Sequence, residues 1–230
     1  MSILADIPHS LDCAQLLRQA HIEPDSDDAA AFMALYETAR TCARPKAFYK
    51  KCDVGSKTGD TVAIGDVTFT SVMLARNLAT VARVFPFVCT CGCELDQVSL
   101  PPGDFLQQFW WDLIKQAYLN VARTYLHDHL IQRYRLGKVA SMAPGTGDAT
   151  VWPIEQQRLL FDLLDGVTAH IGVVLTDSFL MVPNKSVSGI FFPTEHDFRA
   201  CQVCHRERCP GRSAPFDQAL WDATQQSNHP

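Results

Sequence analysis

A long periodic segment constrains the fold of this chain more than any other feature. Residues 104–135 carry apolar side chains at helical spacing, and a Pro-Pro-Gly break at residues 101–103 precedes them. We therefore expect one helix over the whole segment, with Trp110 and Trp111 packed in the core.

Shorter elements are expected on both sides of this helix. Before it, apolar spacing and turn residues predict helices over residues 8–20 and 27–41 and a polar loop over 44–60. Two short strands around Gly65-Asp66 (61–71), a third helix (71–82) and a strand (83–92) are expected next. After it, we expect a Gly/Pro-rich loop over residues 137–153 and a helix over 154–170. Short strands over 172–176 and 186–192 and a short helix near Leu220 are expected after that. We divide the chain into an N-terminal helical segment (1–55) and one larger domain (56–230).

Composition argues against several classes of protein. The 230 residues are 47% apolar and 20% charged, which is ordinary for a globular protein. The formal net charge is −5 and the Lys and Arg residues form no run, so nucleic acid is not the expected partner. No apolar stretch reaches the roughly 18 residues needed to span a bilayer, so no membrane association is expected. The N-terminal residues lack the features of a signal peptide, and we expect a cytoplasmic protein.

The cysteines are numerous and clustered. The chain has nine cysteines, an odd number, and six of them lie in two tight groups: Cys89, Cys91 and Cys93, and Cys201, Cys204 and Cys209. In a cytosolic protein this distribution indicates metal or redox chemistry rather than a disulfide framework.

The second group has the spacing of metal ligands. Thiolates select zinc or an iron–sulfur cluster, and either site needs a fourth ligand beside Cys201, Cys204 and Cys209. Because residues 89, 91 and 93 point to one face of an extended strand, each of those cysteines is a candidate, and we favour Cys91 in its Thr-Cys-Gly turn. His205 is an alternative ligand. Thiols that stay free or pair with one another remain a further alternative.

A second pattern covers the Gly/Pro-rich loop and the segments after it. It consists of Ala-Pro-Gly-Thr-Gly-Asp at 143–148, a Leu-rich helix with Gln156, and Ile-Gly-Val-Val-Leu-Thr-Asp-Ser-Phe-Leu-Met-Val-Pro-Asn-Lys-Ser-Val-Ser-Gly at 171–189. In this order the chain resembles a stand-alone member of the activation (reactivation) domain family of cobalamin-dependent methionine synthase. The resemblance extends over about residues 60–230.

The resemblance implies an α+β fold with a central antiparallel sheet flanked by helices. It implies a domain that caps cobalamin, takes an electron and methylates the cobalamin with S-adenosylmethionine, and a corrinoid-binding methyltransferase protein or domain as the partner. It assigns the run 186–189, with Ser186, Ser188 and Gly189, to the cobalamin-facing surface. The neighbouring Lys185 is a candidate for contact with a propionamide or phosphate of the corrinoid. Those that it assigns to the S-adenosylmethionine loop are Ala143, Gly145 and Thr146.

The chain departs from the family pattern in that loop. The family reads Arg-x-x-x-Gly-Tyr, whereas Ser141 stands here at the Arg position and Thr146 at the Tyr position. Asn120 falls where an acidic contact is expected on the long helix, and Ile190-Phe191 replaces an aromatic pair. Since the missing Arg is the strongest carboxylate anchor, binding of S-adenosylmethionine in the family's manner is not expected.

Three functions follow from these features. The first is reductive reactivation of a corrinoid methyltransferase partner, with electron transfer through an iron–sulfur cluster held by the four cysteines, because such clusters reach potentials near about −700 mV whereas zinc has no redox chemistry. The second is a non-catalytic module that binds the cobalamin protein and holds structural zinc. The third is methylation of cobalamin by S-adenosylmethionine through a rearranged loop.

Overall fold

An eight-stranded sheet forms the centre of the computed structural model, which describes residues 1–145, 150–209 and 212–225. One side of the sheet follows the order β1-β2-β6-β3-β4-β5, while β10 pairs with the other edge of β6 and β7 follows β10. The paired strands in it are antiparallel, which confirms the expected α+β class. The strands are β1 (Ser2–Leu4), β2 (Lys46–Tyr49), β3 (Cys52–Lys57), β4 (Thr61–Ile64), β5 (Val67–Thr70), β6 (Arg83–Thr90), β7 (Val139–Met142) and β10 (Ser186–Pro193).

Strand β6 is buried on both faces, which explains its nearly continuous apolar sequence. Phe85, Phe87 and Cys89 point into one core cluster, and the alternate residues Val84 and Val88 point into another. Because side chains alternate along a strand, β6 joins the two clusters.

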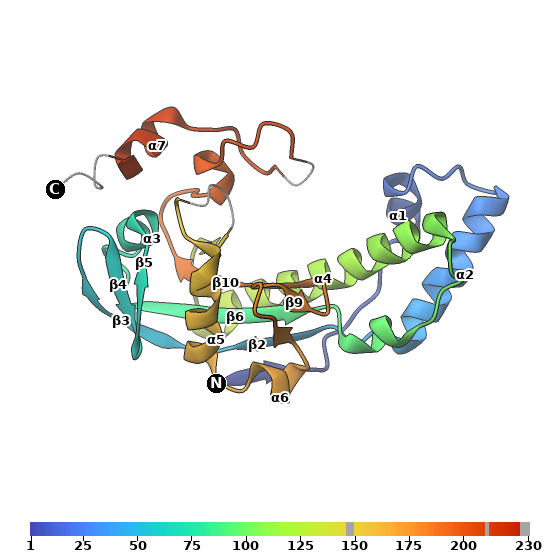
Figure 1. Ribbon diagram of the computed structural model, residues 1–230, viewed down its shortest axis with the longest axis horizontal. Helices are drawn as coiled ribbons and strands as arrows, with labels where there is room; N and C mark the ends of the chain where they lie inside the picture. The colour runs from blue at the N-terminus through green and yellow to red at the C-terminus, as the bar shows by residue number, and fades with distance from the viewer. Residues whose placement is uncertain (146–149, 210–211, 226–230) are drawn as a thin grey trace.

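Helices cover both faces of this sheet (Figure 1). The first cluster is closed by α1 (Cys13–Gln19), α2 (Asp27–Cys42) and the long α4 (Phe105–Tyr134), and the second by α3 (Val72–Asn77), α5 (Gln157–Leu164) and α6 (Val167–Ile171). The expected long helix is confirmed: Asp104 caps it by accepting from the Gln107 N–H at 2.9 Å, and both tryptophans near its start are buried.

The remaining elements are short. A separate hairpin is formed by β8 (Val174–Leu175) and β9 (Met181–Val182), and α7 (Gln218–Gln225) lies near the C-terminus. Three 3-10 helices complete the described part of the chain: η1 (Cys93–Gln97), η2 (Ile154–Gln156) and η3 (Ala200–Val203).

Three sequence expectations were wrong in detail. The expected loop at 44–60 contains β2 and β3, and the expected loop at 137–153 contains β7. The expected helix at 154–170 divides into η2, α5 and α6, because Asp165 and Gly166 adopt positive φ angles of 48° and 73° that a helix does not accommodate.

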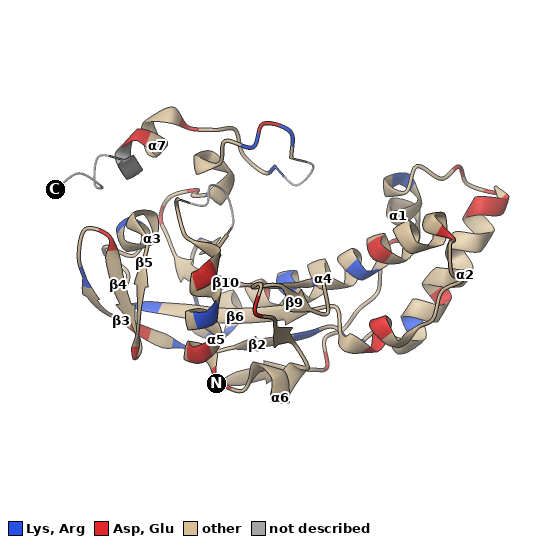
Figure 2. Ribbon diagram, viewed as in Figure 1, with Lys and Arg blue, Asp and Glu red and all other residues tan. Residues whose placement is uncertain are grey.

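The elements are arranged along one long axis (Figure 1). Helices α1 and α2 lie at one end and α7 lies towards the other, while acidic and basic residues are interspersed over the elements (Figure 2). Strands β1 and β2 precede residue 55 yet pair within the same sheet as the later strands, and a division at that position stays a prediction. In the described part of the chain, no helix combines the length and the apolar character needed to cross a bilayer.

Candidate functional site

The β8–β9 hairpin and the segment after it form an exposed apolar surface. Val174, Leu180 and Val182 are 45%, 65% and 51% exposed, which is unusual for large apolar side chains that lie close together. We call these three residues together with segment 183–187 the hairpin face. Only its segment 183–187 overlaps the stretch that the sequence resemblance assigns to cobalamin contact.

Helix α4 holds the hairpin face in place through polar contacts. Lys185 Nζ lies 2.8 Å from Asp112 Oδ2, and Lys115 Nζ donates to Asn184 Oδ1 at 3.0 Å. Lys115 is itself buried and pairs with Asp96. The Lys185 ammonium group is therefore engaged within the protein, and its predicted contact with a corrinoid stays a prediction.

The other predicted cobalamin-facing residues belong to the sheet. Ser186 Oγ donates to Thr90 Oγ1 at 2.9 Å, whereas Ser188 and Gly189 are buried. A Cβ atom at Gly189 would lie 2.6 Å from the Met142 carbonyl oxygen, so glycine is what allows β10 to approach β7 this closely. Ser188 and Gly189 thus shape the support of the hairpin face, and only the start of the Ser-Val-Ser-Gly run is half-exposed.

The loop predicted to hold part of a ligand is only partly described. Gly145 has a φ of 73° and donates its N–H to the Trp152 carbonyl at 2.9 Å, and a Cβ there would lie 2.4 Å from Ile154 Cδ1. Ala143 is half-buried next to the cavity described below. The predicted residue Thr146 lies outside the described residues.

Cys91, the favoured fourth metal ligand, directly follows β6. Its N–H donates to the Lys185 carbonyl at 3.0 Å, and its side chain is buried in the α4-side core. Burial raises the pKa of the Cys91 thiol to about 12, so the thiolate that a metal requires is disfavoured there.

The C-terminal cysteines occupy a turn that Arg212 holds together. Its guanidinium group donates to the carbonyl oxygens of Cys201 at 3.1 Å and Cys204 at 2.9 Å. The Ser213 hydroxyl and N–H group lie 3.5 and 3.4 Å from Cys201 Sγ, and donation from this hydroxyl, with help from the N–H, lowers the pKa of the Cys201 thiol.

The predicted metal quartet is not assembled in the described part of the chain. No three His, Cys, Asp or Glu side chains among these residues are placed to hold a metal ion, so the structure does not bring Cys91 together with Cys201, Cys204 and Cys209. Strand alternation correctly puts Cys89 and Cys91 on one face, but that face points into the core. Cys93 leaves the strand after Gly92, which has a φ of 99°, and lies in η1.

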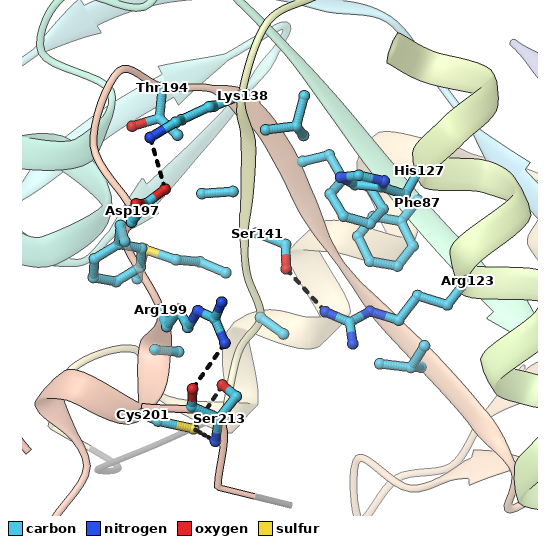
Figure 3. A pocket seen from close by; sticks show the side chains of 18 of the residues that line it. Phe87, Arg123, His127, Lys138, Ser141, Thr194, Asp197, Arg199, Cys201 and Ser213 are labelled. Carbon is cyan, nitrogen blue, oxygen red and sulfur yellow. Dashed lines mark hydrogen bonds and ion pairs between the residues drawn. The ribbon is translucent and has the colours of Figure 1, made fainter. Parts of the chain in front are cut away.

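A cavity of about 560 Å³ lies between α4, β7, β10 and the C-terminal segment (Figure 3). Arg123 reaches from α4 to Ser141, and its Nη2 donates to the hydroxyl oxygen at 3.3 Å. Phe87 and Phe191 stack at 4.3 Å between ring centroids on the α4 side, and Arg199 comes from the C-terminal segment. Neither arginine was among the predicted site residues.

The residues that line this cavity could be predicted only in part from the sequence. Arg123 and His127 are four residues apart on the long helix, which puts them on one face. Nothing in the sequence indicates that this face meets β10 and a segment more than seventy residues further along the chain.

Comparisons with known proteins agree with the architecture and with the sequence pattern. Residues 125–208 match the family described as "Vitamin B12 dependent methionine synthase, activation domain". The fold is similar to that in "Crystal Structure of the MetH Reactivation Domain bound to AdoHcy", with a TM-score of 0.53 and 17% sequence identity over 84% of this chain and 73% of that chain. A search of curated proteins finds no match. Residues 125–208 thus resemble the activation domain of vitamin B12-dependent methionine synthase, and the chain has the fold of the solved reactivation domain.

Proposed function

We propose that this protein docks onto a cobalamin-bearing methyltransferase protein or domain and takes part in its reactivation. The observation that carries the proposal is the family match over residues 125–208, which includes the whole hairpin face. In this proposal the hairpin face meets the corrin, and the sheet beneath it fixes its position.

The physical character of the hairpin face supports a docking role. Its exposed apolar side chains gain free energy when they leave water, at about 25 cal/mol per Å² of buried apolar area. The contacts of Asn184 and Lys185 with α4 pre-organise the segment, so little conformational entropy is lost on binding.

Binding to an isolated cobalamin-binding methyltransferase domain tests the proposal. We expect the double variant Leu180→Asp, Val182→Asp to weaken this binding at least about tenfold, because it places charge in the contact. Leu106→Asp is the matched control: Leu106 is also half-exposed, but it lies at the start of α4. Unchanged affinity in the double variant, measured by calorimetry, would refute docking through this face.

Electron transfer through an iron–sulfur cluster is a finer hypothesis that rests on cysteine spacing alone. The positions of Cys91 and the C-terminal cysteines do not favour a shared site, so no step is assigned to a cluster here. The structural zinc of the second candidate likewise lacks a site among the described residues, so docking is the part of both candidates that we propose.

Metal and sulfide analysis of anaerobically purified protein separates these candidates. Iron with labile sulfide that is lost in Cys204→Ala supports the cluster, and zinc lost in the same variant supports a structural site. The parallel variant Cys52→Ala is the control, because Cys52 is a buried cysteine outside both groups. If wild-type protein carries neither metal nor sulfide, both metal hypotheses fail and docking is unaffected.

Methylation by S-adenosylmethionine is the third candidate. The solved relative is described as bound to AdoHcy, the demethylated form of that ligand. In this chain Ser141 replaces the arginine that the family uses, and the described residues of the loop that follows it include no cationic side chain. We rank this activity below docking for that reason.

A further inference from the structure

The cavity beside α4 is cationic in a protein of negative net charge. The formal net charge of the chain is −5, yet the cavity is lined by Arg123, Arg199 and Lys138 and by a single carboxylate among the described residues, Asp197. That carboxylate is already paired, since Asp197 Oδ1 lies 3.0 Å from Lys138 Nζ. No carboxylate in the described part of the chain lies within ion-pair distance of Arg123 or Arg199.

The two arginines enter the cavity from different walls and keep donors available. Arg123 Nη2 donates to Ser141, and Arg199 Nη1 donates to the Ser213 carbonyl oxygen at 2.8 Å. Figure 3 shows the two guanidinium groups on either side of the Ser141 hydroxyl. Each guanidinium carries five N–H donors, and most donors of both groups have no partner among the described residues, so they are placed to bind oxygen atoms of a ligand.

The wall next to α4 is flat and apolar. The stacked rings of Phe87 and Phe191 form it, and the His127 ring lies 5.8 Å from that of Phe191. A cavity of about 560 Å³ is within the usual range for small organic ligands. The cavity therefore combines an anion-binding side with a surface on which a ring can lie.

We propose that this cavity binds a phosphate monoester of a planar organic compound, with its phosphate group between Arg123 and Arg199. A phosphate monoester carries about −1.5 to −2 charges at pH 7 and three acceptor oxygens, which matches two guanidinium groups on opposite sides. A sulfonium ligand is positively charged at the sulfur and is disfavoured here, because the cavity supplies no free carboxylate among its described residues. The proposal does not depend on docking through the hairpin face.

Three probes that share adenosine and differ in charge test the proposal by calorimetry on the full chain. Adenosine 5′-monophosphate is expected to bind at least about tenfold more tightly than adenosine and than S-adenosylmethionine, and its affinity is expected to fall as salt is raised. Arg123→Ala and Arg199→Ala should each weaken monophosphate binding about tenfold or more, in line with loss of a charged hydrogen bond. Arg123→Lys should retain part of the affinity.

Arg133→Ala is the matched control, since Arg133 lies on the same helix outside the cavity. Circular dichroism verifies that each variant is folded. Equal binding of monophosphate and adenosine, or monophosphate binding that survives both arginine variants, would overturn the proposal. Tighter binding of S-adenosylmethionine than of the monophosphate would also overturn it and would assign the cavity to the ligand type of the family.

Discussion

Cys201 differs in its chemical environment from the buried cysteines of the chain. Hydrogen bonds from Ser213 lower the pKa of its thiol, whereas burial raises the pKa of the Cys52 thiol. A lower pKa means that thiolate forms at lower pH, so we expect Cys201 to react with iodoacetamide below the pH of about 8.5 at which an ordinary cysteine is half-ionised.

Mass spectrometry of partially alkylated protein over a pH series measures this order of reaction. The pH midpoint for Cys201 should rise in Ser213→Ala, which removes the hydroxyl donor, and Cys52 should stay unmodified until the protein unfolds. A midpoint that is the same in wild type and in Ser213→Ala would contradict the role given to Ser213.

At the scale of elements, apolar periodicity and turn residues carried most of the correct predictions. The apolar spacing of residues 104–135 gave α4 almost to the residue, and Gly65-Asp66 marked the turn between β4 and β5. The exposure of β3 explains why its sequence misled: four of its six residues are exposed and polar or glycine, so the segment has the composition of a loop. Helix α6 was merged with α5 because its separation depends on two positive φ angles rather than on apolar spacing.

The site was less predictable than the fold, because its parts are joined only by tertiary contacts. The resemblance located segment 183–187 of the hairpin face but not its exposed apolar residues. The burial of Ser188 and Gly189 follows from the position of β10 between β6 and β7. The predicted metal site combined Cys91 with the C-terminal cysteines on the basis of sequence spacing alone. In the structure, Cys91 follows the buried strand β6 and its side chain lies in the core. Arg123 was missed because its partner Ser141 lies on a strand that the sequence did not predict.

At the scale of the whole molecule, β6 connects both halves of the core, and we expect one cooperative unfolding transition. Trp110 and Trp111 belong to the cluster on the α4 side, and Trp152 belongs to the cluster on the other face. The variant Trp152→Phe, Trp221→Phe keeps only the tryptophans of the α4-side cluster, and the variant Trp110→Phe, Trp111→Phe, Trp221→Phe keeps only Trp152. In each variant, the denaturant midpoint from fluorescence should equal the midpoint from circular dichroism of the same variant. If fluorescence and circular dichroism midpoints separate in either variant, the two faces unfold as independent units.

Helix α4 contacts both surfaces discussed here, and this shared contact has a mechanical consequence. Lys115 anchors the hairpin face and Arg123 lines the cavity, roughly 12 Å further along the same rod at about 1.5 Å of rise per residue. Any displacement of α4 relative to the sheet therefore moves both Lys115 and Arg123. A small molecule that shifts α4 on binding would therefore change the strength of partner capture, and capture would change the occupancy of the small molecule by the same factor.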